Sequence, residues 1–315
     1  MRAVTIKEGV LSVSEHPDPT PGAGEVLVRV RAAGLNGADM MQRRGHYPAP
    51  PGAPQEIPGL ELAGEVLARG PGANRFGEGD RVMAIVGGGG QAELAVVHER
   101  ILMAVPESLS WVQAGGTPEV FTTAHDAVFT QAGLRLGERL LVHGGAGGVG
   151  TAAIQLGRAA GARVTATVRN PDHRAKVAEL GARVIAPEGF GEHGPFDVIL
   201  ELVGAINLAE NVSALEIGGR IAVIGIGAGA KGELNLGALM AKRGCIHAST
   251  LRARPLEAKA LTARALERSV LPLLASGAVH VPIAQEFPLD AAEEAYDRFA
   301  AGGKLGKIVL TMDDR

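Results

Sequence analysis

The sequence predicts an α/β protein with two domains: a β-rich barrel-like unit and a doubly wound parallel sheet. Two observations carry this prediction. Short β-branched runs between Gly/Pro turn segments fill the first third of the chain. In the middle third, unbroken apolar runs alternate with segments of helical period, as expected for strands buried on both faces of a sheet. The length of 315 residues is enough for two domains of ordinary size.

The first third is expected to contain several short strands, among them residues 26–31, 64–68 and 93–97. Gly- and Pro-rich turn segments separate them, at 17–24, 48–54, 70–79 and 87–90. The Pro-rich stretch 45–58 is interpreted as an ordered loop over a site, with a plain surface loop as the alternative.

The middle third predicts six strands alternating with helices: 139–143, 163–168, 184–186, 196–203, 220–225 and 245–251. The helix after the second strand has clear end signals. Asn170 is a typical N-cap, Pro171 fits the first helical position, and Gly181 ends the helix.

The tail predicts a helix over 255–276, a strand over 280–287, a helix over 289–301 and a strand over 307–310. We expect this tail to return to the first domain. The expected domains are therefore 1–117 with 264–315, and 118–263, with a bridging region at about 117–131.

Composition excludes several classes of function. The 31 Lys and Arg against 34 Asp and Glu give a net charge of −3, and aromatic residues are only 3%, so nucleic-acid binding is not expected. No apolar stretch is long enough for a membrane span. The single cysteine, Cys245, excludes an intrachain disulfide and is expected to be buried and inert. The N-terminus lacks a signal-peptide pattern, which predicts a cytoplasmic location.

A glycine cluster indicates a dinucleotide site: Gly145-Ala146-Gly147-Gly148-Val149-Gly150 fits G-x-G-x-x-G between a strand and a helix. The first Gly is expected to permit the tight turn, the second to let a diphosphate approach, and the third to let the helix pack on the strand. Backbone N–H groups and the helix dipole would face the anion. The alternative is a merely flexible strand–helix turn.

The residues after the second strand favour NADPH over NADH. An NAD site usually has an acid there, whereas this chain has Arg169 and Asn170, followed one helical turn later by Arg174. Arg169 can pair with a 2′-phosphate, Asn170 can donate to it, and Arg174 or Lys176 can add charge. The alternative is that Arg169 is a solvated surface residue.

Several separated motifs resemble the medium-chain dehydrogenase/reductase superfamily, and more narrowly its zinc-free NADPH:quinone oxidoreductase (zeta-crystallin-like) branch. The resemblance covers essentially the whole chain. The motifs, in order, are A-G-L-N-G-A-D at 33–39, R-G-H-Y-P at 44–48, P-E-V-F-T-T-A at 118–124, H-G-G-A-G-G-V-G-T-A-A-I-Q-L at 143–156 and G-K-I-V-L at 306–310.

The resemblance implies a GroES-like catalytic barrel completed by the tail, an inserted Rossmann domain, and an active site between them. It further implies a homodimer or homotetramer in which strand 245–251 pairs across a two-fold axis. Tyr47 and Asn36 become candidate catalytic residues, with a packing tyrosine and a turn cap as the respective alternatives. The resemblance implies further cofactor-binding residues in addition to the glycine cluster, Arg169, Asn170 and Arg174. These are Thr123, Gly225, Ile226, Leu251 and Lys307. Lys307 would reach the phosphates, and the alternative is a plain surface lysine.

The resemblance implies no metal. Zinc-dependent relatives have a Cys where this chain has Asn36, and Gly-His-Glu where it has Gly59-Leu60-Glu61. Without a Lewis acid the substrate must accept hydride readily, which favours a quinone. The alternatives are a 2-alkenal or enone double-bond reductase and, from another class, a non-catalytic NADPH-binding structural or regulatory protein. The short connection 186–195 lacks the Tyr that helps bind the 2′-phosphate in some relatives.

Overall fold

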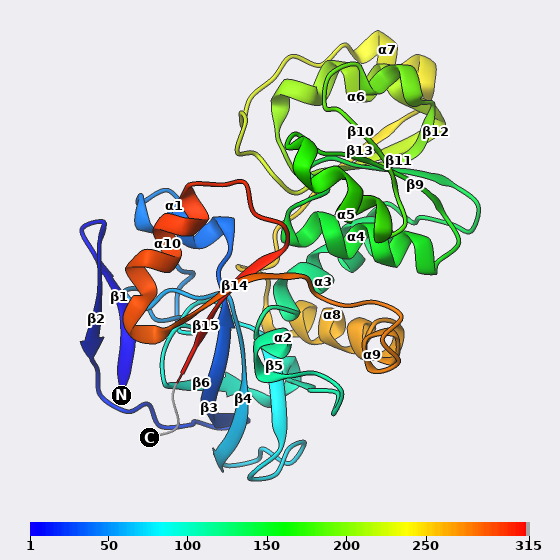
Figure 1. Ribbon diagram of the computed structural model, residues 1–315. Helices are drawn as coiled ribbons and strands as arrows, with labels where there is room; N and C mark the ends of the chain where they lie inside the picture. The colour runs from blue at the N-terminus through cyan, green and yellow to red at the C-terminus, as the bar shows by residue number, and fades with distance from the viewer. Residues whose placement is uncertain (313–315) are drawn as a thin grey trace. The chain divides into compact units, whose positions relative to one another are not determined.

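The computed structural model describes residues 1–312, and the chain divides into two compact units. The first comprises residues 1–122 and the chain from Leu251 onward, and the second comprises Thr123–Thr250. Each unit is shown in Figure 1. Within residues 1–312 no helix is long and apolar enough to cross a membrane.

A largely antiparallel sheet forms the body of the first unit. Its strands follow the order β14-β15-β3-β4-β5-β7, and β6 also pairs with β3. The bounds are β3 Glu25–Gly34, β4 Glu61–Arg69, β5 Arg81–Ile85, β6 Leu94–His98, β7 Met103–Ala104, β14 Ile283–Pro288 and β15 Lys307–Thr311. A separate hairpin joins β1 Arg2–Lys7 to β2 Val10–Glu15. The C-terminal strand β15 lies between β14 and β3, which confirms that the tail returns to the first domain.

Short helices flank this sheet: α1 Gly37–Arg43, α2 Trp111–Gly115, α8 Leu256–Ser269, α9 Leu271–Ala275 and α10 Ala292–Ala300, with single turns η1 Glu99–Ile101 and η6 Leu289–Ala291. The core between sheet and α10 contains Tyr296, which is fully buried and donates its hydroxyl to Gln91 at 2.8 Å. The helix expected over 255–276 is interrupted at Val270, where α8 ends and α9 begins; Pro272 there has no N–H to continue the helical pattern.

The second unit is a six-stranded parallel sheet within residues 123–250, in the order β10-β9-β8-β11-β12-β13. This is the dinucleotide-binding order 3-2-1-4-5-6 when the strands are numbered along the unit. The strand bounds are β8 Arg139–Val142, β9 Arg163–Thr167, β10 Arg183–Ile185, β11 Phe196–Glu201, β12 Leu215–Val223 and β13 Cys245–Ala248. The predicted α/β class with a doubly wound sheet is confirmed.

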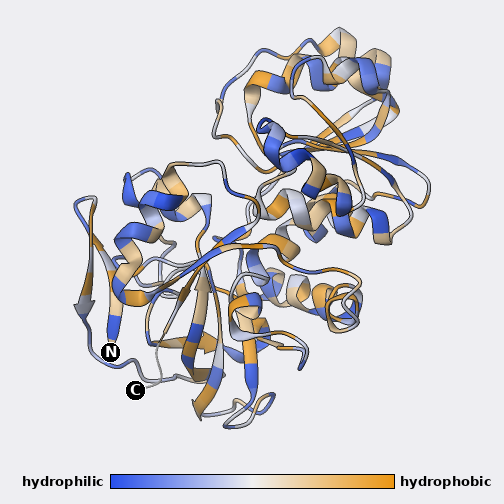
Figure 2. Cartoon of the chain, viewed as in Figure 1, coloured by the Kyte–Doolittle hydropathy of each residue, from blue (hydrophilic) through white to orange (hydrophobic). Residues whose placement is uncertain are grey.

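Helices cover both faces of this sheet, α4 and α5 on one and α6 and α7 on the other (Figure 1). They span α4 Gly148–Ala159, α5 Arg174–Glu179, α6 Leu208–Ala214 and α7 Leu236–Lys242, with single turns η3 Pro171–His173, η4 Phe190–His193 and η5 Ala205–Asn207. Figure 2 shows the strands mostly apolar and the helices two-sided, as burial between two layers requires. Helix α3 Pro118–His125 and the π-helical turn η2 Asp126–Gln131 carry the chain between the units.

The unit boundaries differ from the expected 117/118 and 263/264. The residues from 251 to 263 belong to the first unit because α8 packs against η1 and β7 there. One further expectation is wrong: Cys245 is exposed, because β13 is the edge strand of the parallel sheet and its outer side has no strand partner among residues 123–250.

Candidate functional site

The glycine cluster joins β8 to α4 with a geometry that fits a dinucleotide. Gly147 is the N-cap of α4, so the first N–H groups of a twelve-residue helix follow it. A Cβ at Gly150 would lie 2.4 Å from the Gly144 carbonyl oxygen, so a glycine is needed there for the helix to pack on the strand. The positive φ of the turn, +64°, falls on Gly144 rather than on the expected Gly145. At Gly147, by contrast, a Cβ would meet nothing closer than 3.4 Å.

A basic corner follows β9, as expected. Arg169 is exposed, and Asn170 uses its side-chain oxygen to cap Asp172 at 3.0 Å. Arg174 donates its Nε to the Val168 carbonyl at 3.1 Å, which holds the guanidinium at this corner. Within residues 1–312 no hydrogen bond or ion pair engages the Arg169 side chain. The corner therefore offers cationic N–H groups to an anion.

A buried polar network, not predicted from the sequence, lies at the carboxyl ends of β8 and β11. The Glu201 carboxylate accepts from the Val203 and Gly204 N–H groups and from Asn211 Nδ2 at 2.7 Å. Because Asn211 donates to a carboxylate, its oxygen faces His143 Nε2 at 2.8 Å, and that nitrogen carries the proton. Burial lowers the pKa of His143, so the ring is neutral at neutral pH.

This network reaches the glycine turn. His143 Nδ1 is left to accept from the Thr167 hydroxyl at 3.2 Å, and that hydroxyl accepts the Gly144 N–H at 3.3 Å. The carboxyl end of β11 is thus connected through four side chains to the turn that begins the dinucleotide motif. Each member is nearly excluded from solvent. A histidine after a strand gives no sequence signal for such a role, because its partners come from other strands and helices.

Gly225 and Ile226 follow β12 on the same sheet edge. A Cβ at Gly225 would lie 2.1 Å from the Leu202 carbonyl oxygen, so the chain crosses closely there. Ile226 is 46% exposed, an unusual environment for a large apolar side chain. Thr123, the first residue of this unit, is buried.

In the first unit, Asn36, Glu61 and Lys307 form one buried cluster. The Lys307 ammonium donates to Leu35 O at 2.7 Å, Asn36 Oδ1 at 2.7 Å and Glu61 Oε1 at 2.6 Å. Asn36 Nδ2 donates to the same Glu61 oxygen at 2.9 Å. All three N–H groups of Lys307 are used inside this unit, and the side chain is only 2% exposed. The surface alternative for Lys307 is therefore wrong, and this geometry leaves no N–H free for a cofactor phosphate.

Asn36 is also the N-cap residue of α1, which matches the alternative interpretation of a turn cap. Its backbone N–H donates to Asp39 Oδ2 at 2.8 Å, and the other Asp39 oxygen accepts from Gly59 N at 3.1 Å. Burial raises the pKa of Asp39 to about 6. The second Glu61 oxygen accepts the Glu119 N–H at 2.8 Å, so the cluster also fixes the start of α3.

Tyr47 lies in the Pro-rich loop beside Arg252, a residue that the sequence analysis did not identify. The Arg252 guanidinium carbon is 5.1 Å from the Tyr47 ring centroid. The same guanidinium donates to the carbonyls of Tyr47 and Gly87, both at 2.8 Å, and to Gln42 Oε1. Burial raises the pKa of the half-buried Tyr47, so its phenol keeps the proton. The loop is thus ordered by a buried arginine. Leu251, next to Arg252, belongs to this unit and lines a hollow in it.

The residues present do not fit a zinc ion. At the position where the resemblance places a ligand, Asn36 binds a lysine and a carboxylate, and Leu60 is a buried apolar residue. Within residues 1–312 no three His, Cys, Asp or Glu side chains are grouped so that they could hold a metal.

Two family models match the chain: the alcohol dehydrogenase GroES-like domain over residues 22–107 and the zinc-binding dehydrogenase model over 148–267. Human quinone oxidoreductase is 32% identical, covering 99% of this chain and 98% of that protein. Acryloyl-coenzyme A reductase from Metallosphaera sedula is 31% identical, covering 99% and 100%. A crystal structure of an NAD-dependent alcohol dehydrogenase superimposes with a TM-score of 0.87 at 29% identity, covering 99% and 100%.

The chain belongs to the medium-chain dehydrogenase/reductase superfamily, whose members are nicotinamide-dependent oxidoreductases acting on small molecules. Within it, the full-length similarity places the chain in the quinone oxidoreductase (zeta-crystallin-like) branch. This confirms the family predicted from the motifs.

Proposed function

We propose that this protein transfers reducing equivalents from NADPH to a quinone without zinc. The observation that carries the proposal is the Lys307–Asn36–Glu61 cluster, in which a lysine amine binds the side chains at the positions of metal ligands in zinc-dependent relatives. An oxidoreductase without a Lewis acid needs an acceptor that takes hydride readily. Quinones do so because the added charge spreads over the ring and onto oxygen.

The glycine turn and basic corner fit NADPH. The N–H groups at the start of α4 would bind the diphosphate, and Arg169, Asn170 and Arg174 would bind the 2′-phosphate. Gly225, Ile226, Thr123 and Leu251 remain proposed cofactor contacts from the resemblance. Bound NADPH would supply the hydride, and the protein would supply orientation and exclusion of water. Neither the short strand β10 (Arg183–Ile185) nor the connection after it contains a tyrosine. The proposed binding of the 2′-phosphate therefore depends on the arginines.

Tyr47 is the proposed hydrogen-bond donor to the acceptor. Its phenol is protonated at neutral pH, since burial raises its pKa, and it can donate to the carbonyl oxygen on which negative charge develops. Asn36 is proposed as a positioning residue. Both its N–H groups already donate, to Glu61 and to the Gly34 carbonyl at 3.2 Å, so it orders the first unit rather than donating to a substrate.

A second candidate is reduction of the C=C bond of a 2-alkenal or enone. The similarity to acryloyl-coenzyme A reductase favours it, because an acryloyl group is a conjugated alkenoyl. The same cofactor site and the same phenol would serve both reactions, since in each one an oxygen conjugated to the acceptor carbon gains charge.

The test is oxidation of NADPH, followed by its absorbance, with ortho- and para-quinones, 2-alkenals and enones, and with NADH in parallel. Turnover of quinones with a strong NADPH preference supports the proposal. Turnover of alkenals alone moves the assignment to the double-bond reductase. Tight NADPH binding with no turnover of either class supports the third interpretation, a structural or regulatory NADPH-binding protein.

We further propose a homodimer, or a homotetramer built from it, through β13. This edge strand is paired on one side only within residues 123–250, and α7 beside it exposes Leu236 by 64% and Met240 by 76%. Unpaired edges and exposed large apolar residues are typical of interfaces. Light scattering after gel filtration tests this, and a monomeric mass at micromolar concentration would contradict it.

A further inference from the structure

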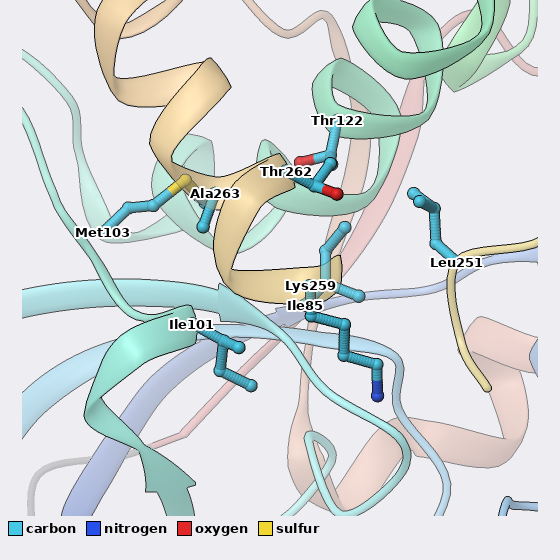
Figure 3. Close-up of a pocket in the computed structure, with 8 residues that line it drawn as sticks. All are labelled: Ile85, Ile101, Met103, Thr122, Leu251, Lys259, Thr262 and Ala263. Carbon is cyan, nitrogen blue, oxygen red and sulfur yellow. The ribbon is translucent and has the colours of Figure 1, made fainter. Parts of the chain in front are cut away.

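The hollow beside α8 in the first unit is too small for an organic ligand. Its wall includes Thr122 from α3 and Lys259 and Thr262 from α8 (Figure 3). Its volume of about 20 Å³ admits about one water. Such a water suits the buried Thr122 hydroxyl, which has no hydrogen-bond partner within residues 1–312. The hollow therefore adds no binding site to the one proposed above.

In the second unit, the buried carboxylate of Glu201 holds the loop after β11 and the start of α6. One of its oxygens accepts from the Val203 and Gly204 N–H groups, at 2.6 and 2.8 Å. The other accepts from Asn207 Nδ2 at 3.1 Å and from Asn211 Nδ2 at 2.7 Å. An ionised carboxylate has only acceptors, so every group that faces it must donate.

This requirement fixes the proton positions along the network that reaches the glycine turn. Asn211 turns its NH2 toward Glu201, so its oxygen accepts from His143 Nε2 at 2.8 Å. His143 Nδ1 is then an acceptor, and the Thr167 hydroxyl donates to it at 3.2 Å. The oxygen of that hydroxyl accepts the Gly144 N–H at 3.3 Å. Each group thus donates in the direction of Glu201, and the series begins at the glycine turn.

Gly144 is the residue through which the network acts on the turn. Its φ is +64°, and its carbonyl accepts at 3.0 Å from the N–H of Gly147, the N-cap of α4. Thr167 holds the turn twice, because its carbonyl accepts the Gly145 N–H at 3.0 Å while its hydroxyl accepts the Gly144 N–H. The N–H groups at the start of α4 therefore depend on the Thr167 hydroxyl for their orientation.

We propose that Glu201 and His143 are positioning residues for the dinucleotide. The Glu201 carboxylate sets the tautomer of His143, and that tautomer orients the Thr167 hydroxyl that holds the glycine turn. Glu201 and His143 are 3% and 1% exposed, so they act through the turn and not by contact with the cofactor. This role rests on the dinucleotide part of the proposed function and is independent of the acceptor that is reduced.

Glu201→Gln reverses the proton positions while keeping the shape of the side chain. The backbone N–H groups of the loop after β11 cannot turn, so the glutamine oxygen stays with them and its NH2 faces Asn207 and Asn211. Asn211 must then flip its amide and donate to His143, which moves the ring proton to Nδ1. The Thr167 hydroxyl now receives two donors, and its own proton has no acceptor among the described residues.

The tautomer is measured first, by nitrogen NMR of isotope-labelled imidazole rings in the protein without nucleotide. Wild type is expected to carry the His143 proton on Nε2, and Glu201→Gln is expected to carry it on Nδ1. Glu192→Gln makes the same change at an exposed acid of the same unit and should keep the proton on Nε2. A wild-type ring protonated on Nδ1, or an unchanged tautomer in Glu201→Gln, overturns the proposal.

The affinities for NADPH and NADH are then measured by calorimetry. Glu201→Gln is expected to weaken both by about tenfold, because the turn would hold the diphosphate that the two nucleotides share. A merely structural role would lower the melting temperature and leave both dissociation constants unchanged. Unchanged dissociation constants in a variant whose tautomer has switched overturn the positioning role.

Thr167→Val and Thr167→Ser decide the question if Glu201→Gln does not fold. Valine replaces the hydroxyl by a methyl group of the same shape, so the affinities for NADPH and NADH should fall about tenfold while the His143 proton stays on Nε2. Serine keeps the hydroxyl and should restore the affinity of wild type. Full affinity in Thr167→Val overturns the proposal.

Quinone turnover separates this role from the proposed function. A switched tautomer with weaker binding of both nucleotides, in a protein that reduces no quinone, leaves the positioning role standing and refutes the proposed function. An unchanged tautomer in Glu201→Gln, together with quinone reduction by wild type, refutes the positioning role alone.

Discussion

The Lys307 ammonium lies 2.6 Å from Glu61 Oε1, and both side chains are sealed from solvent, at 2% and 0% exposure. The lysine begins strand β15 and the glutamate begins β4, so the pair connects the two separate sequence segments that make up the first unit. Asn36 bridges them by binding both partners.

Lys307→Met is expected to destabilise the protein by about 3–5 kcal/mol, because it leaves the Glu61 carboxylate buried and uncompensated. Urea unfolding measures this. The double variant Glu61→Gln with Lys307→Met should recover part of the loss, since no charge is then buried alone. A single variant as stable as wild type would show that the pair carries no net stabilisation.

Gly150 and Gly147 are expected to respond differently to alanine. Gly150→Ala places a Cβ 2.4 Å from Gly144 O and should cost about 1–3 kcal/mol of stability as well as NADPH binding. In Gly147→Ala the new Cβ makes only ordinary van der Waals contact, so the melting temperature should be unchanged. The affinity for NADPH should nevertheless fall, because the methyl group keeps the diphosphate away from the backbone. Thermal unfolding without and with NADPH distinguishes the two. Full NADPH affinity in both variants would place the cofactor elsewhere.

Arg169→Ala is expected to weaken NADPH binding by about tenfold or more, the value of one charge-assisted contact, and to leave NADH binding unchanged. Fluorescence titration with NADPH and with NADH measures the ratio of the two dissociation constants. Arg163→Ala, which removes an exposed cation at the opposite end of β9, is the matched control. An equal loss for both nucleotides would remove the 2′-phosphate as the partner of Arg169.

Arg252→Met is expected to destabilise the first unit by about 3 kcal/mol, because one buried and two partly buried acceptors lose their donor. The loop of Tyr47 should become mobile, with a rise in KM for the acceptor and a faster proteolytic cut within residues 45–58. Limited proteolysis checks the second effect directly. Protection of the loop equal to that of wild type would contradict an ordering role for Arg252.

Lys304 provides a pH test. Burial, with the charges of Lys307 and Arg298, lowers its pKa from 10.5 to about 8. Between these values the unfolded chain binds more protons than the folded one, so the free energy of unfolding rises with pH in this window. The free energy of unfolding of Lys304→Met should therefore exceed that of wild type by about 1 kcal/mol at neutral pH. This gap between the two proteins should decrease as the pH approaches 10.5. A gap that does not change with pH would show that Lys304 titrates normally.

The doubly wound sheet could be predicted because each of its signals is local. Apolar runs, the Asn170 cap and the Gly145–Gly150 spacing all lie within short windows of sequence. The corrections concern relations between distant residues. Nothing near Lys307 indicates that it pairs with Glu61 and donates to Asn36, and nothing near Cys245 indicates that its strand lies at an edge. Arg252 was missed for the same reason, since its three acceptors lie in segments around residues 42, 47 and 87.

The position of β15 determines when the first unit can be completed during synthesis. Val309, Leu310 and Thr311 pair with Gly34, Ala33 and Ala32, so β3 lacks this neighbour until residues 309–311 have been synthesised and have left the ribosome. The continuous stretch Thr123–Thr250 has no such dependence and can close its sheet earlier. A nascent chain truncated before β15 should therefore hold a folded nucleotide unit beside an open sheet, which chaperones would have to cover.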